Sequence, residues 1–244
     1  MFTLNSSNPV VIKQAKDGYR HSIEPFLLAD FISLSTGCRI LDVGTGCGII
    51  PLLLTTRRAI EKIVAIEIQS SLYNLAVHNI SMNGVADRVQ LIHDDFISLK
   101  PSNGLFDFII SNPPFRKLNS GRINSNREKA IARHELSMDI ESLMTGVNSF
   151  LKDGGTFTFA YPPTRLTELI DQLYIHRLFP ARLRFIHGSR EVRARILLID
   201  AVRERQTDCV IEPSLYIYNE NGSYSDEMEK IYASFNCASR THHF

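Results

Sequence analysis

Five consecutive residues, 111–115, have side chains suited to chemistry on a planar nitrogen atom. Pro113 and Pro114 fix two backbone φ angles and remove two N–H donors, so the segment offers mainly hydrogen-bond acceptors. These acceptors are the amide oxygen of Asn112 and the backbone carbonyls, and the ring of Phe115 follows them. Two acceptors can hold the hydrogens of a planar amine while an aromatic ring packs on its π system. The alternative is an ordinary turn, since Asn and Pro are frequent turn residues.

The position of this segment favours the chemical interpretation. The apolar run just before it, residues 106–110, predicts a short buried strand. Asn112 then lies at the carboxyl end of a strand, which is where open α/β sheets bind their ligands.

A glycine-rich stretch at residues 42–48 lies between a predicted strand and a predicted helix. Glycines at such a turn allow a close approach of the backbone to a nucleotide. The spacing is Asp-x-Gly-x-Gly-x-Gly, formed by Asp42, Gly44, Gly46 and Gly48. A carboxylate here repels a pyrophosphate but suits a ligand that has an amino group and a positive charge. The alternative is a tight turn without a ligand.

Two more acids follow the next two predicted strands. Glu67 ends the first of them, where a carboxylate commonly holds ribose hydroxyls. Asp95 follows the second and can accept a hydrogen bond from an adenine amino group. Taken singly, either acid can be a solvated charge. Three acids at successive strand ends, beside the glycines, predict a site for S-adenosylmethionine.

Strand and helix signals alternate along most of the chain. Strands are predicted at residues 39–43, 62–67, 88–92, 106–111, 156–161, 182–187 and 195–202. Helices are predicted at residues 25–32, 49–57, 70–82, 139–151 and 164–176, and a turn at 152–155. Seven strands interleaved with helices predict a Rossmann-like α/β fold with a mostly parallel, doubly wound sheet. The short spacing of the last two strands predicts an antiparallel hairpin at one edge of the sheet.

Length and composition favour a single domain over residues 1–244. We expect residues 1–35 to form a loop and a helix over the pocket, 36–205 the catalytic core, and 206–244 a carboxyl-terminal appendix. The net charge of +1 excludes a global basic field. The cysteines and histidines lack metal-binding spacing, so no metal is expected. Neither a signal peptide nor a membrane-length apolar run is visible, which predicts a cytoplasmic protein without membrane contact.

The motifs described above resemble those of class I S-adenosylmethionine-dependent methyltransferases that modify planar nitrogens. Residues 18–29 resemble the opening of the bacterial valine-tRNA N6-adenine methyltransferases, and residues 120–135 resemble the loop after their Asn-Pro-Pro motif. The resemblance implies methylation of the N6 amine of an adenine in tRNA, adenine 37 beside the anticodon of tRNA(Val). The sequence departs from the family pattern at Phe115, where Tyr is common, and at Glu24, where Asp is common. Phe is also typical of guanine N2 methyltransferases.

The residue types and the resemblance together assign roles. The predicted catalytic residues are Asn112, Pro113, Pro114 and Phe115. The predicted cofactor-binding residues are Asp42, Gly44, Gly46, Gly48, Glu67, Asp95 and Asn112. In this hypothesis the Asn112 side-chain oxygen and the Pro113 carbonyl each accept one N6 hydrogen, so positioning and electrostatics supply most of the catalysis. Phe115 stacks on the target base, which must leave its own stack.

Arginines supply the expected contacts to tRNA, the predicted partner. Nine of them lie in the later part of the chain: Arg165, Arg177, Arg182, Arg184, Arg190, Arg193, Arg195, Arg203 and Arg205. The loop at residues 116–133 is basic as well. A basic rim beside the pocket attracts phosphates, although any single arginine can be a solvated surface charge.

Three other functions stay open. A protein glutamine N5-methyltransferase also needs acceptors for a planar amide nitrogen, although residues 1–35 are too few for a helical recognition domain before the first strand. A guanine N2 RNA methyltransferase is consistent with Phe115. A catalytically silent RNA-binding protein is the third, and the presence of Asn112 and the cofactor acids argues against it.

Overall fold

The computed structural model describes residues 10–13, 23–57, 60, 62–101, 105–113 and 139–235. The first elements are α1 (Glu24–Phe31), β1 (Arg39–Val43), α2 (Ile49–Thr55), β2 (Lys62–Glu67), α3 (Ser70–Met82), β3 (Val89–His93) and β4 (Phe106–Ser111). They are followed by α5 (Ile140–Phe150), β5 (Leu151–Tyr161), a 3-10 turn (Pro163–Arg165), α6 (Leu166–Ile175), β6 (Leu178–His187), β7 (Ala194–Arg203), β8 (Val210–Ile211), β9 (Leu215–Tyr216) and α7 (Asp226–Ser234).

A mixed β-sheet organises these elements. Its strand order is β3-β2-β1-β4-β5-β7-β6-β8, and β9 also pairs with β6. Strands β1 to β5 are mutually parallel, whereas β7 runs antiparallel to both of its neighbours, β5 and β6. The prediction of a Rossmann-like, mostly parallel sheet of seven strands with an antiparallel hairpin is confirmed. Two further strands of two residues each, β8 and β9, extend it beside β6.

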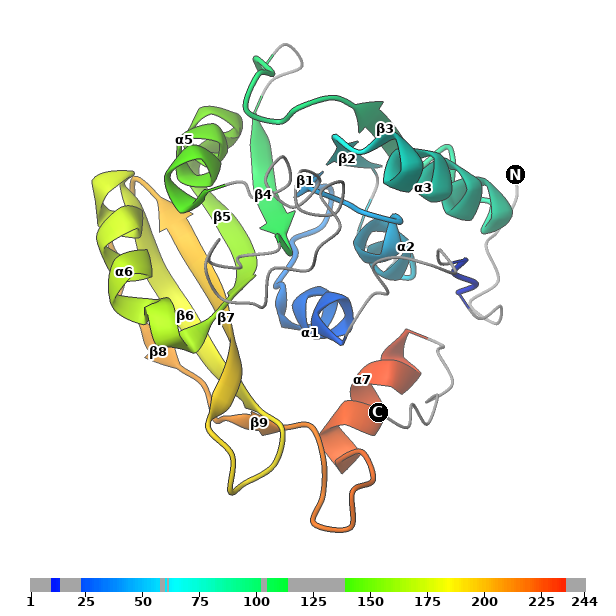
Figure 1. Cartoon of the computed structure of the whole chain (residues 1–244). Helices are drawn as coiled ribbons and strands as arrows, with labels where there is room; N and C mark the ends of the chain where they lie inside the picture. The colour runs from blue at the N-terminus through cyan, green and yellow to red at the C-terminus, as the bar shows by residue number, and fades with distance from the viewer. Residues whose placement is uncertain are drawn as a thin grey trace, which may run out of the picture.

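Helices cover both faces of this sheet (Figure 1). On one face, α1, α2 and α7 share a core that includes Leu28, Ile50 and Ile231. On the other face, α5 and α6 bury Leu143 and Leu169. Burial of apolar side chains is the dominant favourable term in folding, so these layers hold the strands rigidly and leave the loops at the strand ends to carry the polar groups.

The beginning of β5 differs from the expectation. The sequence predicts a turn at residues 152–155, and this prediction is wrong. β5 starts at Leu151, directly after α5, and runs through these residues. Its pairing with β4 shifts between Leu151 and Thr156, so the intervening residues form a bulge. Gly154 has a φ of 73° there, which glycine adopts without steric cost. The glycines therefore allow a bulged strand and do not end one.

The parallel strands all end at one side of the sheet, which we refer to as the carboxyl edge. Val43 of β1 lies opposite both Ile66 of β2 and Ser111 of β4. Glu67 of β2 lies opposite His93 of β3. The segments that follow these four strands therefore start side by side. Because β6 runs in the same direction as β5, the tip of the β6–β7 hairpin also lies at the carboxyl edge.

Candidate active site

Residues 42–48, which we call the glycine segment, leave β1 at the carboxyl edge in a defined conformation. The N–H groups of Gly44 and Thr45 both donate to the Ile66 carbonyl, at 3.0 and 2.9 Å. Gly44 and Gly46 have φ angles of 71° and 61°, which residues with a Cβ rarely adopt. A Cβ built at either glycine would meet no described atom within 4 Å. The space beside these two residues is therefore open to a ligand.

Gly48 has a different reason for being glycine. Its φ is also positive, at 81°. In addition, a Cβ here would lie 3.3 Å from the Cβ of Ala76 in α3. This glycine therefore lets the start of α2 pack closely against α3. Its predicted contact with a cofactor stays a prediction.

Asp42 is the buried acid of the site. Its side chain is fully buried, and neither carboxylate oxygen has a hydrogen-bond partner among the described residues. Burial raises the pKa of Asp42 to about 7; the nearby Thr45 hydroxyl opposes this rise and the charge of Glu67 adds to it. An unpartnered buried acid costs stability. Such groups are frequent at functional sites. The Asp42 carboxylate can accept hydrogen bonds from the amino group of a ligand.

Glu67 lies at the end of β2 and orients the glycine segment. One of its carboxylate oxygens accepts a hydrogen bond from the Gly46 N–H and the other from the Gln69 N–H, both at 2.8 Å. Glu67 is almost fully buried, but each oxygen keeps a further lone pair. The carboxylate can therefore hold the loop and still accept from ribose hydroxyls.

Asp95 lies in the turn after β3. Its Oδ1 accepts a hydrogen bond from the Ile97 N–H at 3.0 Å, so this acid closes its own turn. The second oxygen makes no hydrogen bond to the described part of the chain. That oxygen can serve a ligand amino group, as the sequence predicts.

Ile68 is a candidate that the motifs do not indicate. It follows Glu67 directly and is 48% exposed. Ile97, after the neighbouring strand, is 42% exposed. Two exposed apolar side chains beside the acids suit a flat nucleoside ring. The available signal was an apolar residue placed immediately after a strand-end acid.

Two of the predicted catalytic residues, Asn112 and Pro113, are described, and both are partly exposed. The other two, Pro114 and Phe115, lie outside the described residues, as does the loop that follows them. Just before Asn112, the buried Ser111 hydroxyl donates to the Val43 carbonyl at 2.8 Å. This bond joins the end of β4 to the end of β1. The segment that starts at Asn112 therefore leaves β4 beside the glycine segment.

Most of the nine arginines are held by acids of this chain. Arg165 pairs with Glu168, Arg177 with Glu204, Arg182 with Asp200 and Glu212, Arg184 with Glu227, and Arg203 with Asp153. The other four of these nine make no ion pair within the described ranges: Arg190, Arg193, Arg195 and Arg205. Three of these four belong to the β6–β7 hairpin, at the carboxyl edge.

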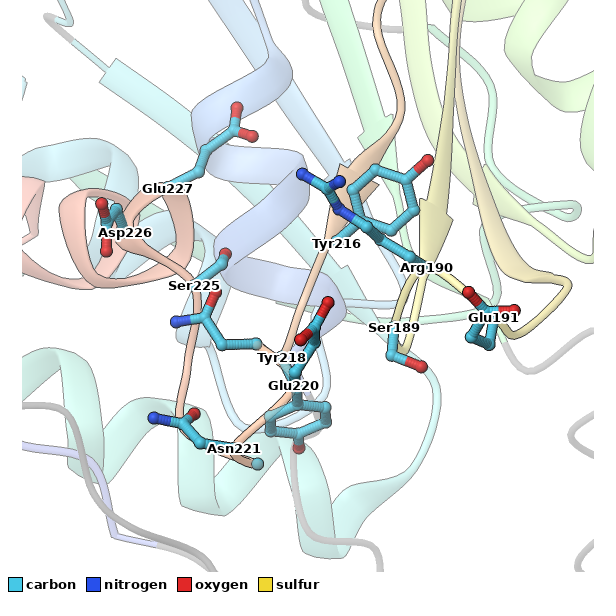
Figure 2. Close-up of a pocket in the computed structure, with 12 residues that line it drawn as sticks. Ser189, Arg190, Glu191, Tyr216, Tyr218, Glu220, Asn221, Ser225, Asp226 and Glu227 are labelled. Carbon is cyan, nitrogen blue, oxygen red and sulfur yellow. The ribbon is translucent and has the colours of Figure 1, made fainter.

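Figure 2 shows a wide hollow between the hairpin tip, β9 and the start of α7. Arg190 extends over the Tyr216 ring there, 5.9 Å from its centroid. Four carboxylates also line the hollow, those of Glu191, Glu220, Asp226 and Glu227. This excess of acids makes the hollow a poor site for RNA phosphates, and Arg190 belongs to it.

The described residues contain no cluster of His, Cys, Asp or Glu side chains that could hold a metal ion. None of the helices that the structure describes is long and apolar enough to cross a membrane. The polar groups at the carboxyl edge are the carboxylates of the acids, the backbone of the glycine segment and the amide of Asn112.

A parallel sheet with an acid-led glycine segment and acids at the neighbouring strand ends defines a Rossmann-like methyltransferase of class I. The family model of the methyltransferase small domain matches residues 25–158, more than half of the 244 residues. The chain belongs to this family.

Curated relatives cover most of the chain. A protein of Dyadobacter fermentans named tRNA1(Val) (adenine(37)-N6)-methyltransferase is 26% identical over 88% of this chain and 89% of its own length. A protein of the same name from Vibrio campbellii is 25% identical over 92% and 91%. That of Bacteroides thetaiotaomicron is 35% identical over 60% of each chain. These values show distant similarity along nearly the whole length.

A solved structure shares the fold. A predicted O-methyltransferase from Agrobacterium tumefaciens superposes with a TM-score of 0.69 at 16% identity, over 90% of this chain and 100% of that one. An S-adenosylmethionine-dependent methyltransferase from Aquifex aeolicus has a TM-score of 0.52 at 19% identity, over 72% and 88%.

Proposed function

We propose that this protein transfers the methyl group of S-adenosylmethionine to the exocyclic N6 amine of an adenine in tRNA. The observation that carries the proposal is the placement of Asn112 directly beside the glycine segment, joined through the bond between Ser111 and Val43. The relatives' name supplies the substrate, adenine 37 of tRNA(Val). We further propose that the chain acts as one domain in the cytoplasm, with tRNA as its partner.

The residues present fit S-adenosylmethionine. The unpartnered carboxylate of Asp42 suits its amino group, and the remaining lone pairs of Glu67 suit its ribose hydroxyls. Asp95 suits the amino group of its adenine ring, and the open side of Gly44 and Gly46 gives it room. When bound, it supplies an electrophilic methyl group on a sulfonium centre.

The chain's own contribution is to hold the target nitrogen. The lone pair of adenine N6 is delocalised into the ring, so this nitrogen is a weak nucleophile. The Asn112 side-chain oxygen and the Pro113 carbonyl each accept one N6 hydrogen, which directs the lone pair toward the methyl group. Once the nitrogen has gained the methyl group, it releases one proton to water. Preorganised acceptors and orientation therefore supply the rate enhancement, and no general base is required.

Among the residues that the structure describes, we assign contacts with tRNA to Arg193 and Arg195. Both side chains are exposed and make no ion pair within the described ranges. Both lie near the tip of the β6–β7 hairpin, at the edge where Asn112 lies. Guanidinium groups at this place attract the phosphates of an approaching tRNA. The paired arginines are assigned to structure.

The test is transfer of a labelled methyl group from S-adenosylmethionine to bulk tRNA that lacks this modification, followed by mass spectrometry of the nucleosides. The proposal predicts labelled N6-methyladenosine. Label in N2-methylguanosine would favour the guanine enzyme, and label in a glutamine-bearing protein fraction would favour the protein methyltransferase. Bound cofactor without methyl transfer to either would overturn the proposal.

A further inference from the structure

We propose that Asn79 of α3 is a positioning residue, which holds the glycine segment in the conformation that S-adenosylmethionine requires. The inference rests on the proposed function, because it assigns Asn79 a role in the affinity for that cofactor. No sequence motif indicates Asn79, which contacts the glycine segment from α3.

The Asn79 side chain bridges two parts of the chain. It is fully buried. Its Nδ2 group donates to the Cys47 carbonyl at 2.9 Å and to the Lys13 carbonyl at 3.0 Å. Its Oδ1 accepts from the Lys13 N–H at 2.9 Å. One amide thus joins Cys47, near the end of the glycine segment, to Lys13 of the amino-terminal residues 10–13.

The glycine segment needs such external support. Glycine has no side chain that can restrict its backbone, so a loop rich in glycine is held by its neighbours. The Glu67 carboxylate holds the Gly46 N–H, and Asn79 holds the carbonyl of the next residue, Cys47. Ala76, one turn earlier on α3, packs against Gly48. Three consecutive loop residues are therefore each held by one contact from outside the loop.

Asn83 provides a matched control. It lies one turn after Asn79, at the C-cap of α3, and its side chain holds Val11 by the same kind of bond pair that joins Asn79 to Lys13. Its Oδ1 accepts from the Val11 N–H at 3.0 Å, and its Nδ2 donates to the Val11 carbonyl at 2.7 Å. The remaining hydrogen bond of its side chain within the described residues goes from Nδ2 to the Asn79 carbonyl, at 2.7 Å, and not to the glycine segment. Loss of Asn83 therefore loosens the amino-terminal residues but leaves the bond to Cys47.

The experiment compares Asn79→Ala with Asn83→Ala in the full chain. Calorimetry gives the Kd for S-adenosylmethionine, and steady-state assays give both KM values and kcat. We expect the Kd and the cofactor KM to rise about tenfold or more in Asn79→Ala, the effect of losing the one buried hydrogen bond that holds the glycine segment. In Asn83→Ala they stay within about twofold. In both variants the KM for tRNA and kcat at saturating cofactor stay within about twofold, which a general loss of structure would not produce.

Equal rises in both variants would overturn the inference, as would an unchanged Kd in Asn79→Ala. If that variant does not fold, Asn79→Asp takes its place, because it keeps the size and the acceptor for Lys13 but loses both donors. Its Kd is judged by the same limits. The two proposals fail separately: wild-type protein that does not bind S-adenosylmethionine contradicts the proposed function, whereas wild-type binding with unchanged Asn79 variants contradicts only this inference.

Discussion

The two halves of the sheet differ in whether their buried ionisable side chains have partners. In β1, Asp42 is buried without a hydrogen-bond partner among the described residues. In β6, Arg182 bonds to Asp200 and Glu212, and Arg184 of β6 and Arg203 of β7 are paired with acids too. An unpartnered buried acid indicates a place for a ligand, whereas a paired charge supports the fold.

The largest effect is expected at the substrate side of the first region. Asn112→Ala removes one of the two acceptors for the target amine, so we expect methyl transfer to fall by about a thousandfold or more. Asn112 is also predicted to contact the cofactor, but the Kd for S-adenosylmethionine should stay within about twofold, because Asp42, Glu67 and Asp95 still hold it. Single-turnover transfer and calorimetry measure the two quantities. Near-normal transfer would refute the proposed role of Asn112.

The second effect tests whether the paired arginines are structural. Arg182 also donates to the Phe31 carbonyl and lies over the Phe31 ring, 3.8 Å from its centroid. Arg182→Ala leaves the mostly buried Asp200 without its cationic partner, so we expect the free energy of unfolding to fall by about 2–4 kcal/mol. Urea denaturation measures it. Arg205→Ala is the control, since it removes an exposed and unpaired arginine and should change stability by less than about 0.5 kcal/mol.

The third effect separates ligand binding from stability at Asp42. Asp42→Asn should raise the Kd for S-adenosylmethionine about tenfold or more, because the negative charge that faces the ligand is lost. The unliganded variant should nevertheless be more stable than wild type at pH 8, by about 1–3 kcal/mol.

The pH dependence of this gain follows from the pKa of Asp42. The folded protein holds this proton until about pH 7, whereas the unfolded chain releases it near pH 4. The stability of the wild type therefore falls as the pH rises through this window, and the asparagine variant lacks the fall. Denaturation curves at pH 4 and pH 8 test this. A variant less stable than wild type at pH 8 would contradict the account.

The smallest effect concerns the hairpin. The double variant Arg193→Glu and Arg195→Glu should raise the KM for tRNA by roughly three- to tenfold and weaken its dependence on salt. Arg205→Glu reverses one charge beyond the other end of β7 and should leave the KM within about twofold, whereas Arg193→Glu alone, an equal change in net charge, should still raise it. Equal effects of these two single variants would mean that only net charge matters.

The sequence predicts the strands and the carboxyl edge well, because acids and glycines there directly follow apolar runs. Contacts between distant residues leave no such local signal. The bond between Asn79 and Cys47 spans 32 positions, and the pairing of Arg182 with Asp200 spans 18. The bulge at the start of β5 was missed because its glycines are equally typical of a turn. The roles of Pro114 and Phe115 stay predictions.

The most direct measurement uses two tRNA(Val) transcripts that differ only at position 37, which holds adenine in one and guanine in the other. Each is incubated with the protein and S-adenosylmethionine, and its nucleosides are separated by mass spectrometry. The proposed function predicts N6-methyladenosine in the adenine transcript and no methyl in the guanine transcript. N2-methylguanosine in the guanine transcript, or equal methylation of both, would contradict it.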